Sequence, residues 1–345
     1  MEKRKKFCFM AALFLLILAT ISLTAYGIFY CYYSKMNIQT EDNGGSEEIA
    51  VKDLPGKEIK SYEDYLREKL EAQTEDIPYD AQNVYNVLLI GTDSRAPEEN
   101  SRSDSMILVS INRKTEKIIM TSIMRDIYCT IPGVGDNRIN AACAYGGAPL
   151  LLAAIEYNFG IQVDDYAVIN FYGFIDAVNA AGGVELEVTA AEIKEMNGWM
   201  ETMNALLHEE RDADKLDESD AGPLLLNGKQ ALIFSRIRYT GDSDFERTGR
   251  QRRVLTALLN KAKSLSFPAL NGLLNAVLPC ITTNLTQGKV LSLLLCSKEY
   301  LDYEVVSGRI PIDGSWSSMN VRGMAVLRID FSENRDYWYE LVYGE

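Results

Sequence analysis

Histidine is almost absent from this chain: among 345 residues there is only one, His208. A catalytic triad of serine, histidine and aspartate, or a zinc site rich in histidine, would have to be built around that residue. His208 lies in the polar run LLHEERDADKLDESD, which is typical of an exposed segment. We therefore expect His208 to be an ordinary surface residue, which limits the chemistry open to the protein.

Cysteine is also scarce. The six cysteines form no CxxC pair and have no histidine beside them, so the sequence does not predict a zinc site. Cys8 and Cys31 belong to an apolar N-terminal segment. The other four could form one or two disulfides or remain buried thiols, and the sequence does not pair them: Cys129, Cys143, Cys280 and Cys296.

Positive charge is in deficit, because 35 basic residues face 49 acidic ones and the net charge is −14. A non-specific nucleic-acid binder needs a basic footprint, so we expect no nucleic-acid partner. The apolar fraction of 47% and the mean hydropathy of −0.11 are ordinary for a folded protein. The chain is long enough for one large domain or two small ones.

One long uncharged run is present, from Phe7 to Tyr33. It exceeds the roughly 20 residues that a helix needs to cross a bilayer, and it ends in tyrosines, as expected at a membrane interface. We interpret 7–33 as a single transmembrane anchor; a cleaved signal peptide is the less favoured alternative. The basic residues of 1–6 form a cytoplasmic tail, so the rest of the chain, with a net charge of −17, lies outside the cell membrane.

The outer part divides by composition. Residues 34–80 are polar and acidic and are interpreted as a spacer. From 81 to 335, short apolar runs typical of strands alternate with longer helix-like stretches, which predicts a single α/β domain with a central mixed sheet flanked by helices. The stretch 195–222 is polar and suggests an insertion or a mobile flap, and 336–345 is interpreted as a C-terminal tail.

Acidic and basic residues follow the predicted strands. Asp93 and Arg95 come directly after the run VYNVLLIG, where ligand groups of α/β sheets tend to lie. The runs SMILVSI and KIIMTSI, joined by NRKTE, predict a hairpin. Asp104 and Arg125 are each about ten residues from the centre of its turn, so antiparallel pairing should make them neighbours.

The stretch SDFERTGRQRR, residues 243–253, concentrates four arginines in an acidic protein. On a helix, Arg247 and Gln251 share a stripe with the apolar Val254 and Leu258, so both should point inward at the helix N-terminus, which favours phosphate. The remaining arginines of the stretch should be solvated or paired with nearby acids: Arg250, Arg252 and Arg253. In the preceding SRIR, an extended backbone would put Arg236 and Arg238 on one face.

Arginines aimed at one place repel each other unless they hold an anion. The candidate pyrophosphate-binding residues are Arg95, Arg125, Arg236, Arg238, Arg247 and Gln251. Asp93 and Asp104 suit Mg²⁺, which is commonly held by one or two carboxylates together with phosphate oxygens. Helix capping, or pairing with the same arginines, is the alternative for these two acids.

Several stretches resemble the LytR–CpsA–Psr family of bacterial cell-wall enzymes: GTDSR, RSDSMILVSINRKTEKIIMTSIMRDIY, IPGVGDNRINAACAYGG and DFERTGRQRRV. The resemblance runs in order from about residue 83 to about 265. The chain departs from the family pattern at Met124, where proline is common, and at Ser105, where threonine is usual. Neither 195–222 nor the C-terminal RDYWYELVYGE is covered by these motifs.

The resemblance implies a phosphotransferase that moves an anionic glycopolymer, such as teichoic acid or capsule, from a polyprenyl-pyrophosphate carrier to peptidoglycan on the wall side of a bacterial membrane. Asp93 and Asp104 would be the magnesium-associated acids and, with Arg125, the catalytic residues, and the arginines would hold the pyrophosphate. The resemblance also implies an apolar tunnel for the polyprenyl chain. The helices 148–158, 171–181 and 254–277 are apolar enough to line it, although an ordinary core explains them equally well.

Two rival functions remain open at this stage. The same site could hydrolyse the pyrophosphate with water as the acceptor. Alternatively, the protein could be a membrane-tethered binder of lipid or glycan that regulates without turnover.

Overall fold

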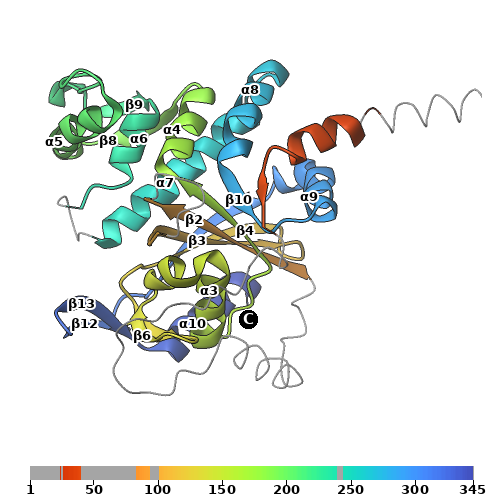
Figure 1. Cartoon of the computed structure of the whole chain (residues 1–345), viewed down its shortest axis with the longest axis vertical. Helices are drawn as coiled ribbons and strands as arrows, with labels where there is room; N and C mark the ends of the chain where they lie inside the picture. The colour runs from red at the N-terminus through yellow and green to blue at the C-terminus, as the bar shows by residue number, and fades with distance from the viewer. Residues whose placement is uncertain (1–23, 25, 40–82, 94–100, 239–243, 345) are drawn as a thin grey trace, which may run out of the picture.

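A seven-stranded mixed sheet forms the centre of the molecule (Figure 1). The computed structural model describes residues 24, 26–39, 83–93, 101–238 and 244–344. In spatial order the strands are β1 (Asn37–Ile38), β10 (Ile281–Thr283), β7 (Asp165–Asn170), β2 (Val84–Thr92), β3 (Ser103–Asn112), β4 (Lys117–Ile123) and β11 (Glu304–Ile310). β2, β3 and β4 form an antiparallel meander, and β7 runs parallel to β2. The predicted α/β domain with a central mixed sheet is confirmed.

One face of the sheet packs against the two helices α3 (Ala141–Phe159) and α10 (Phe331–Tyr343). Alternate residues of the central strands point to this side, because successive side chains of a strand face opposite ways. Leu88 and Leu108 are fully buried there, together with Leu151 of α3 and Trp338 of α10. The apolar residues of α3 therefore belong to an ordinary core, the second of the two alternatives for 148–158.

The opposite face is covered by α4 (Phe171–Ala180), α7 (Asp244–Lys263) and α8 (Phe267–Val277), which lie on the other side of the sheet in Figure 1. Several apolar side chains on this face are only half-buried, among them Leu89, Val109, Ile111 and Ile118. The two faces thus differ: one is sealed, and the other keeps partly accessible apolar surface beneath the helices.

A second, smaller core lies beyond α4. It is built from β8 (Val184–Val188), α5 (Ala190–Leu207), β9 (Gly222–Leu226) and α6 (Gly228–Phe234). Met196, Met200 and Met203 of α5 are buried in it. The first part of the polar stretch 195–222 is therefore a packed helix rather than a flap, because these three methionines recur at helical spacing and face inward.

The remaining elements complete the periphery: β5 (Tyr128–Ile131), β6 (Gly135–Arg138), η3 (Glu218–Asp220), η4 (Leu278–Cys280), α9 (Gln287–Tyr300), β12 (Trp316–Val321) and β13 (Met324–Ile329). α10 continues past residue 335 and buries Trp338 and Val342, so 336–343 belongs to the domain instead of forming a tail. The five cysteines in the described residues are free thiols, and Cys129 and Cys143 are buried. Burial raises the pKa of the Cys143 thiol to about 12.

The N-terminal helix (26–33) packs on the domain and leads into β1, which pairs in parallel with β10. At the start of the expected spacer, residues 37–38 therefore join the main sheet, after a turn at 34–36. Most of the predicted anchor 7–33, the cytoplasmic tail 1–6 and the rest of the spacer lie outside the described residues. No helix in the described part of the chain has the length and apolarity to cross a bilayer.

Candidate functional site: an arginine cluster at the ends of β2, β3 and β4

A β-bulge places Asp104 at the edge of the site. Gly91 pairs with Ser105 and Thr92 pairs with Ser103, so Asp104 is the extra residue of β3. A bulge re-aims the side chain it carries, and bulges often lie beside active sites. Arg125, two residues after the end of β4, donates a hydrogen bond from Nη1 to Oδ1 of Asp104. The predicted neighbourhood of Asp104 and Arg125 is confirmed.

Asp93 follows β2 directly and is exposed at the same end of the sheet. Arg236 lies close to both predicted acids: the charges of Asp104 and Asp93 oppose the effect of burial, which lowers the pKa of its guanidinium. Arg95 lies outside the described residues, so its placement stays a prediction.

Arg236 and Arg238 reach the site from a turn and the segment after it, not from a strand. α6 ends at Phe234, and its capping box, in which Asn227 and Gln230 bond to each other's backbone, starts the short helix that carries the chain there. The guanidinium of Arg236 stacks 4.2 Å from the ring centroid of Phe171, at the carboxyl end of β7. Nε of Arg238 lies 3.3 Å from Oδ1 of Asp244. Both arginines lie at the site, as predicted, but a turn and an irregular segment carry them instead of the predicted extended backbone.

Arg247 and Gln251 point inward from the first turns of α7, as predicted. Arg247 is 3% exposed, and its Nη1 lies 3.0 Å from Oδ1 of Asp244. Nε of Arg247 is buried and has no hydrogen-bond partner among the described residues. Oε1 of Gln251 accepts a hydrogen bond of 3.0 Å from the hydroxyl of Ser105, which ties α7 to the strand that carries Asp104.

A pair of carboxyl groups, not foreseen from the sequence, lies behind these arginines. Asp126 and Asp244 share a hydrogen bond. Burial raises the pKa of Asp126, and the hydrogen bond to Asp244 acts in the same sense. Burial also opposes ionisation of Asp244, but Arg247 and the hydrogen bond from Asp126 lower its pKa. Asp126 therefore binds a proton more readily than Asp244, whose carboxylate pairs with Arg247 and Arg238.

Burial and neighbouring charges act strongly on the guanidinium of Arg247. Burial and then the charge of Arg125 lower the pKa of Arg247 to about 10, although Asp244 opposes both. A guanidinium is normally protonated far above neutral pH, so this lowering shows that the surroundings disfavour its charge. Burial also lowers the pKa of Arg236, whereas the pKa of Arg125 is raised because Asp104 and Asp126 outweigh its burial. In the cluster of Arg125, Arg236, Arg238 and Arg247, it is therefore Arg236 and Arg247 whose charge would gain most from a bound anion.

The other arginines of 247–253 differ from expectation. Arg250 is buried, and its Nε lies 2.8 Å from Oε1 of Glu192 on α5, also buried. Arg252 donates a hydrogen bond of 2.6 Å to the hydroxyl of Ser122 on β4. Arg253 stacks its guanidinium on Phe234, 5.1 Å from the ring centroid. The prediction was wrong for Arg250 and Arg252, because distant segments supply their partners, whereas Arg253 is exposed, as predicted.

The oxygen donors near the arginines suit magnesium. Asp93 and Asp104 are close enough to Arg236 that both affect its pKa, and carboxylate oxygens are ligands that Mg²⁺ prefers. Asp104 uses Oδ1 for Arg125. Among the described residues no group of three or more histidine, cysteine, aspartate or glutamate side chains could hold a metal by itself. Further ligands of a magnesium ion would have to come from water and from phosphate, which is how Mg²⁺ is usually bound.

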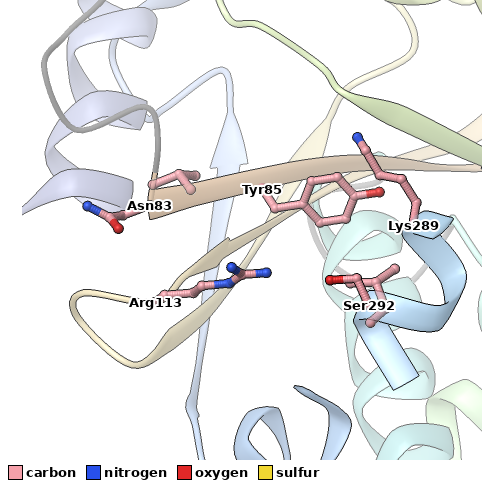
Figure 2. Close-up of a pocket in the computed structure, with 7 residues that line it drawn as sticks. Asn83, Tyr85, Arg113, Lys289 and Ser292 are labelled. Atoms are coloured by element: carbon pink, nitrogen blue, oxygen red, sulfur yellow. The ribbon is translucent and has the colours of Figure 1, made fainter. Parts of the chain in front are cut away.

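A separate pocket lies at the opposite end of β2. Its volume is about 220 Å³, and Figure 2 shows Tyr85, Arg113 and Lys289 around it. Tyr85 and Lys289 both donate hydrogen bonds to Oδ2 of Asp165, at 2.6 and 2.7 Å, so this lysine is neutralised locally. The pocket is roughly 27 Å from Asp93, the length of a strand of this size, and does not belong to the arginine site.

His208 takes no part in the site. It is exposed at the C-terminal end of α5 and adopts a left-handed backbone conformation there, as the cap of the helix. The expectation of an ordinary surface residue is confirmed.

The fold is an α/β domain with a cluster of arginines at one end of its central sheet. More specifically, the chain belongs to the LytR_cpsA_psr family, whose sequence profile matches residues 51–341.

Several similar proteins are named as transferases. A teichoic acid transferase of Oceanobacillus iheyensis, named polyisoprenyl-teichoic acid–peptidoglycan teichoic acid transferase TagU, is 34% identical over 224 residues, which are 63% of each chain. The protein of the same name from Bacillus cereus is 31% identical over 258 residues, 72% of this chain and 78% of its own. The solved structure of a LytR-CPS2A-psr family protein, YwtF (TagT), with bound octaprenyl pyrophosphate lipid is 25% identical. Its TM-score is 0.57, and the match covers 78% of this chain and 94% of that one.

Proposed function

We propose that the protein is a phosphotransferase that moves an anionic glycopolymer of the teichoic acid type from a polyprenyl-pyrophosphate carrier to peptidoglycan. The observation that carries the proposal is the buried guanidinium of Arg247 among three other arginines, with an Nε that has no partner among the described residues. The names of the relatives and the octaprenyl pyrophosphate in the structural neighbour support the same substrate class.

The reaction is a substitution at phosphorus. A hydroxyl oxygen of peptidoglycan bonds to the phosphorus that carries the glycan, and the bond from this phosphorus to the bridging oxygen breaks. Polyprenyl phosphate leaves with the electron pair, and the glycan becomes joined to peptidoglycan through a phosphodiester. The pyrophosphate linkage supplies the driving force, so no nucleotide is required.

The arginines would bind the diphosphate and stabilise the charge that develops on the leaving phosphate. Catalysis of phosphoryl transfer depends mainly on such positioning and electrostatic stabilisation. Arg125 is oriented by Asp104, and Arg238 and Arg247 are oriented by Asp244. We assign Gln251 and the undescribed Arg95 to the same binding set.

Asp93 and Asp104 would hold Mg²⁺, which supplies neutralisation of the phosphate oxygens when it is bound. One of these two carboxylates would accept the proton of the attacking hydroxyl, because no histidine lies at the site. The partly accessible apolar face that includes Leu89, Val109 and Ile118 would accommodate the polyprenyl chain beneath α7 and α8.

The protein would act at the outer surface of a cell membrane, anchored by residues 7–33. A transfer assay tests the proposal. The full chain in detergent would be incubated with Mg²⁺, a labelled polyprenyl-pyrophosphate glycan and a peptidoglycan oligosaccharide, with Arg247→Ala as the control. We expect label to move to the oligosaccharide and the variant to lose this activity. Release of free phosphorylated glycan would instead establish a hydrolase, and retention of an unchanged lipid would establish a binding protein.

A further inference from the structure

α9 exposes an apolar stripe that no described element covers. Leu291, Leu294 and Leu295 are 39%, 55% and 77% exposed. We call these three residues the α9 stripe. Large apolar side chains with this exposure are ordinary when scattered, but three on one helix form a patch, and such patches mark interaction sites.

The α9 stripe continues from the place where the N-terminal helix meets the domain. Gln287 lies one turn before Leu291 on the same side of α9, since residues four apart are neighbours on a helix surface. The hydroxyl of Tyr26, in the N-terminal helix, lies 3.4 Å from Oε1 of Gln287 and donates a hydrogen bond to it. In Figure 1 the N-terminal helix, drawn in red, lies beside α8 and α9.

The N-terminal helix is held firmly at this position. The hydroxyl of Tyr33 donates a hydrogen bond of 3.0 Å to the carbonyl of Leu285, just before α9, and that of Tyr32 donates to Asn271 of α8. β1 then pairs with β10. This helix is the end of the uncharged run Phe7–Tyr33, and its exposed side chains include Tyr26 and Tyr30. An anchor formed by this run would leave the bilayer next to α9.

Lysines gather around the stripe in an otherwise acidic domain. Nine lysines follow residue 82, and four of them lie on α9 or on the end of α7: Lys261, Lys263, Lys289 and Lys298. Nζ of Lys263 donates a hydrogen bond of 2.8 Å to the carbonyl of Leu301, which brings the end of α7 beside the end of α9. Glu299 and Asp302 lie at this end of α9 as well, so the excess of positive charge is local and modest. Lys289 is neutralised by Asp165, so the lysines that would be attracted to anionic lipid headgroups are Lys261, Lys263 and Lys298.

We propose that α9 lies on the membrane surface, with the leucines of the stripe at the boundary of headgroups and acyl chains and the lysines at the level of the lipid phosphates. Helices that combine an apolar side with flanking lysines bind bilayer interfaces in this way, and long lysine side chains reach toward the phosphates. The occupant of this surface is an anionic phospholipid bilayer. The inference rests on the proposed membrane anchor, but it does not depend on the proposed transfer chemistry.

Site-specific photo-cross-linking tests the contact. The full chain would carry Leu295→p-benzoylphenylalanine and would be reconstituted into vesicles of phosphatidylethanolamine and phosphatidylglycerol with a radiolabelled lipid. The matched control is Leu225→p-benzoylphenylalanine, because Leu225 is also an exposed leucine, at 57%, and β9 lies on the far side of the molecule in Figure 1. We expect several-fold more lipid adduct at position 295 than at position 225.

Equal adduct at the two positions, or a cross-link from position 295 to a second copy of the chain, would overturn the inference. Flotation of the vesicles after an alkaline wash reports on the anchor: failure to float would overturn both the anchor and the α9 contact. The transfer assay on the same vesicles is independent of these readouts. Adduct at position 295 without transfer would reject the proposed chemistry and leave the membrane contact standing.

Discussion

Asp104 and Arg125 are joined by a hydrogen bond although 21 positions separate them in the sequence. One is the bulged residue of β3 and the other follows β4, so the β3–β4 hairpin brings a carboxylate and a guanidinium together at its open end. The carboxylate orients the arginine through one of its two oxygens.

Replacing Asp104 should therefore remove activity without unfolding the domain. For Asp104→Asn we expect kcat to fall by roughly 100-fold or more, the scale seen when one electrostatic element of an active site is lost. The side chain of Asp104 is 24% exposed, so the melting temperature should change little. Asp313→Asn is the matched control, because Asp313 is 94% exposed. Equal activity of the two variants in the transfer assay would exclude Asp104 from the site.

Arg247 should contribute to function and not to stability. Its charge is disfavoured where it is buried, so Arg247→Met should leave the free energy of unfolding unchanged or raise it. The same change should lower transfer by roughly 100-fold or more, by loss of an electrostatic contact to the diphosphate. Urea denaturation and the transfer assay measure the two effects. A large loss of stability would mean that the pairing with Asp244 outweighs the cost of burial.

Asp126 and Asp244 should respond oppositely to pH. The pKa of Asp126 is raised in the folded protein, so its contribution to stability is present below the pKa of the unfolded chain and is lost as the pH rises through the folded value. The pKa of Asp244 is lowered, so its contribution is present at neutral pH and is lost as the pH falls. Asp126→Asn should consequently stabilise the protein at pH 7, and Asp244→Asn should destabilise it. Melting curves between pH 4 and 8, at constant ionic strength, would show this; the reverse order would mean that Asp244 binds a proton more readily than Asp126.

The buried ion pair of Glu192 and Arg250 should support the fold at a distance from the chemistry. Removing one partner from such a pair leaves an uncompensated buried charge, and for Arg250→Ala we expect a loss of about 3–5 kcal/mol in the free energy of unfolding. The double variant Glu192→Gln, Arg250→Met should be less destabilised than Arg250→Ala, because no buried charge remains. Chemical denaturation checks both. Similar losses in the two variants would show that packing, not charge, dominates here.

The parts of the site that depend on local pairing could be predicted from the sequence. Asp104 and Arg125 lie at similar separations from the hairpin turn, so antiparallel pairing predicts that they are neighbours. Arg247 lies seven residues, or two helical turns, before Val254, so the helix predicts that both point inward. The backbone that carries Arg236 and Arg238 could not be predicted from their alternation, because the same spacing occurs in the turn after α6.

Other features depend on contacts between distant segments. Arg250 finds Glu192 58 positions away, on a helix whose polar sequence suggested a flap. Asp126 lies near Asp244 because α7 packs on β3 and β4, a contact between segments far apart in the sequence. One signal was available: Asp244 lies three residues before Arg247, a spacing that favours an ion pair on a helix.

The pairing of β1 with β10 has a consequence for the geometry of the whole protein. A domain joined to its N-terminal helix by a long flexible linker would rotate freely, and the arginine cluster at the end of its sheet would face every direction in turn. Here the chain enters the sheet within four residues of the N-terminal helix, so a rotation of that helix turns the sheet with it. The direction in which the arginines face is thereby set relative to the axis of the N-terminal helix.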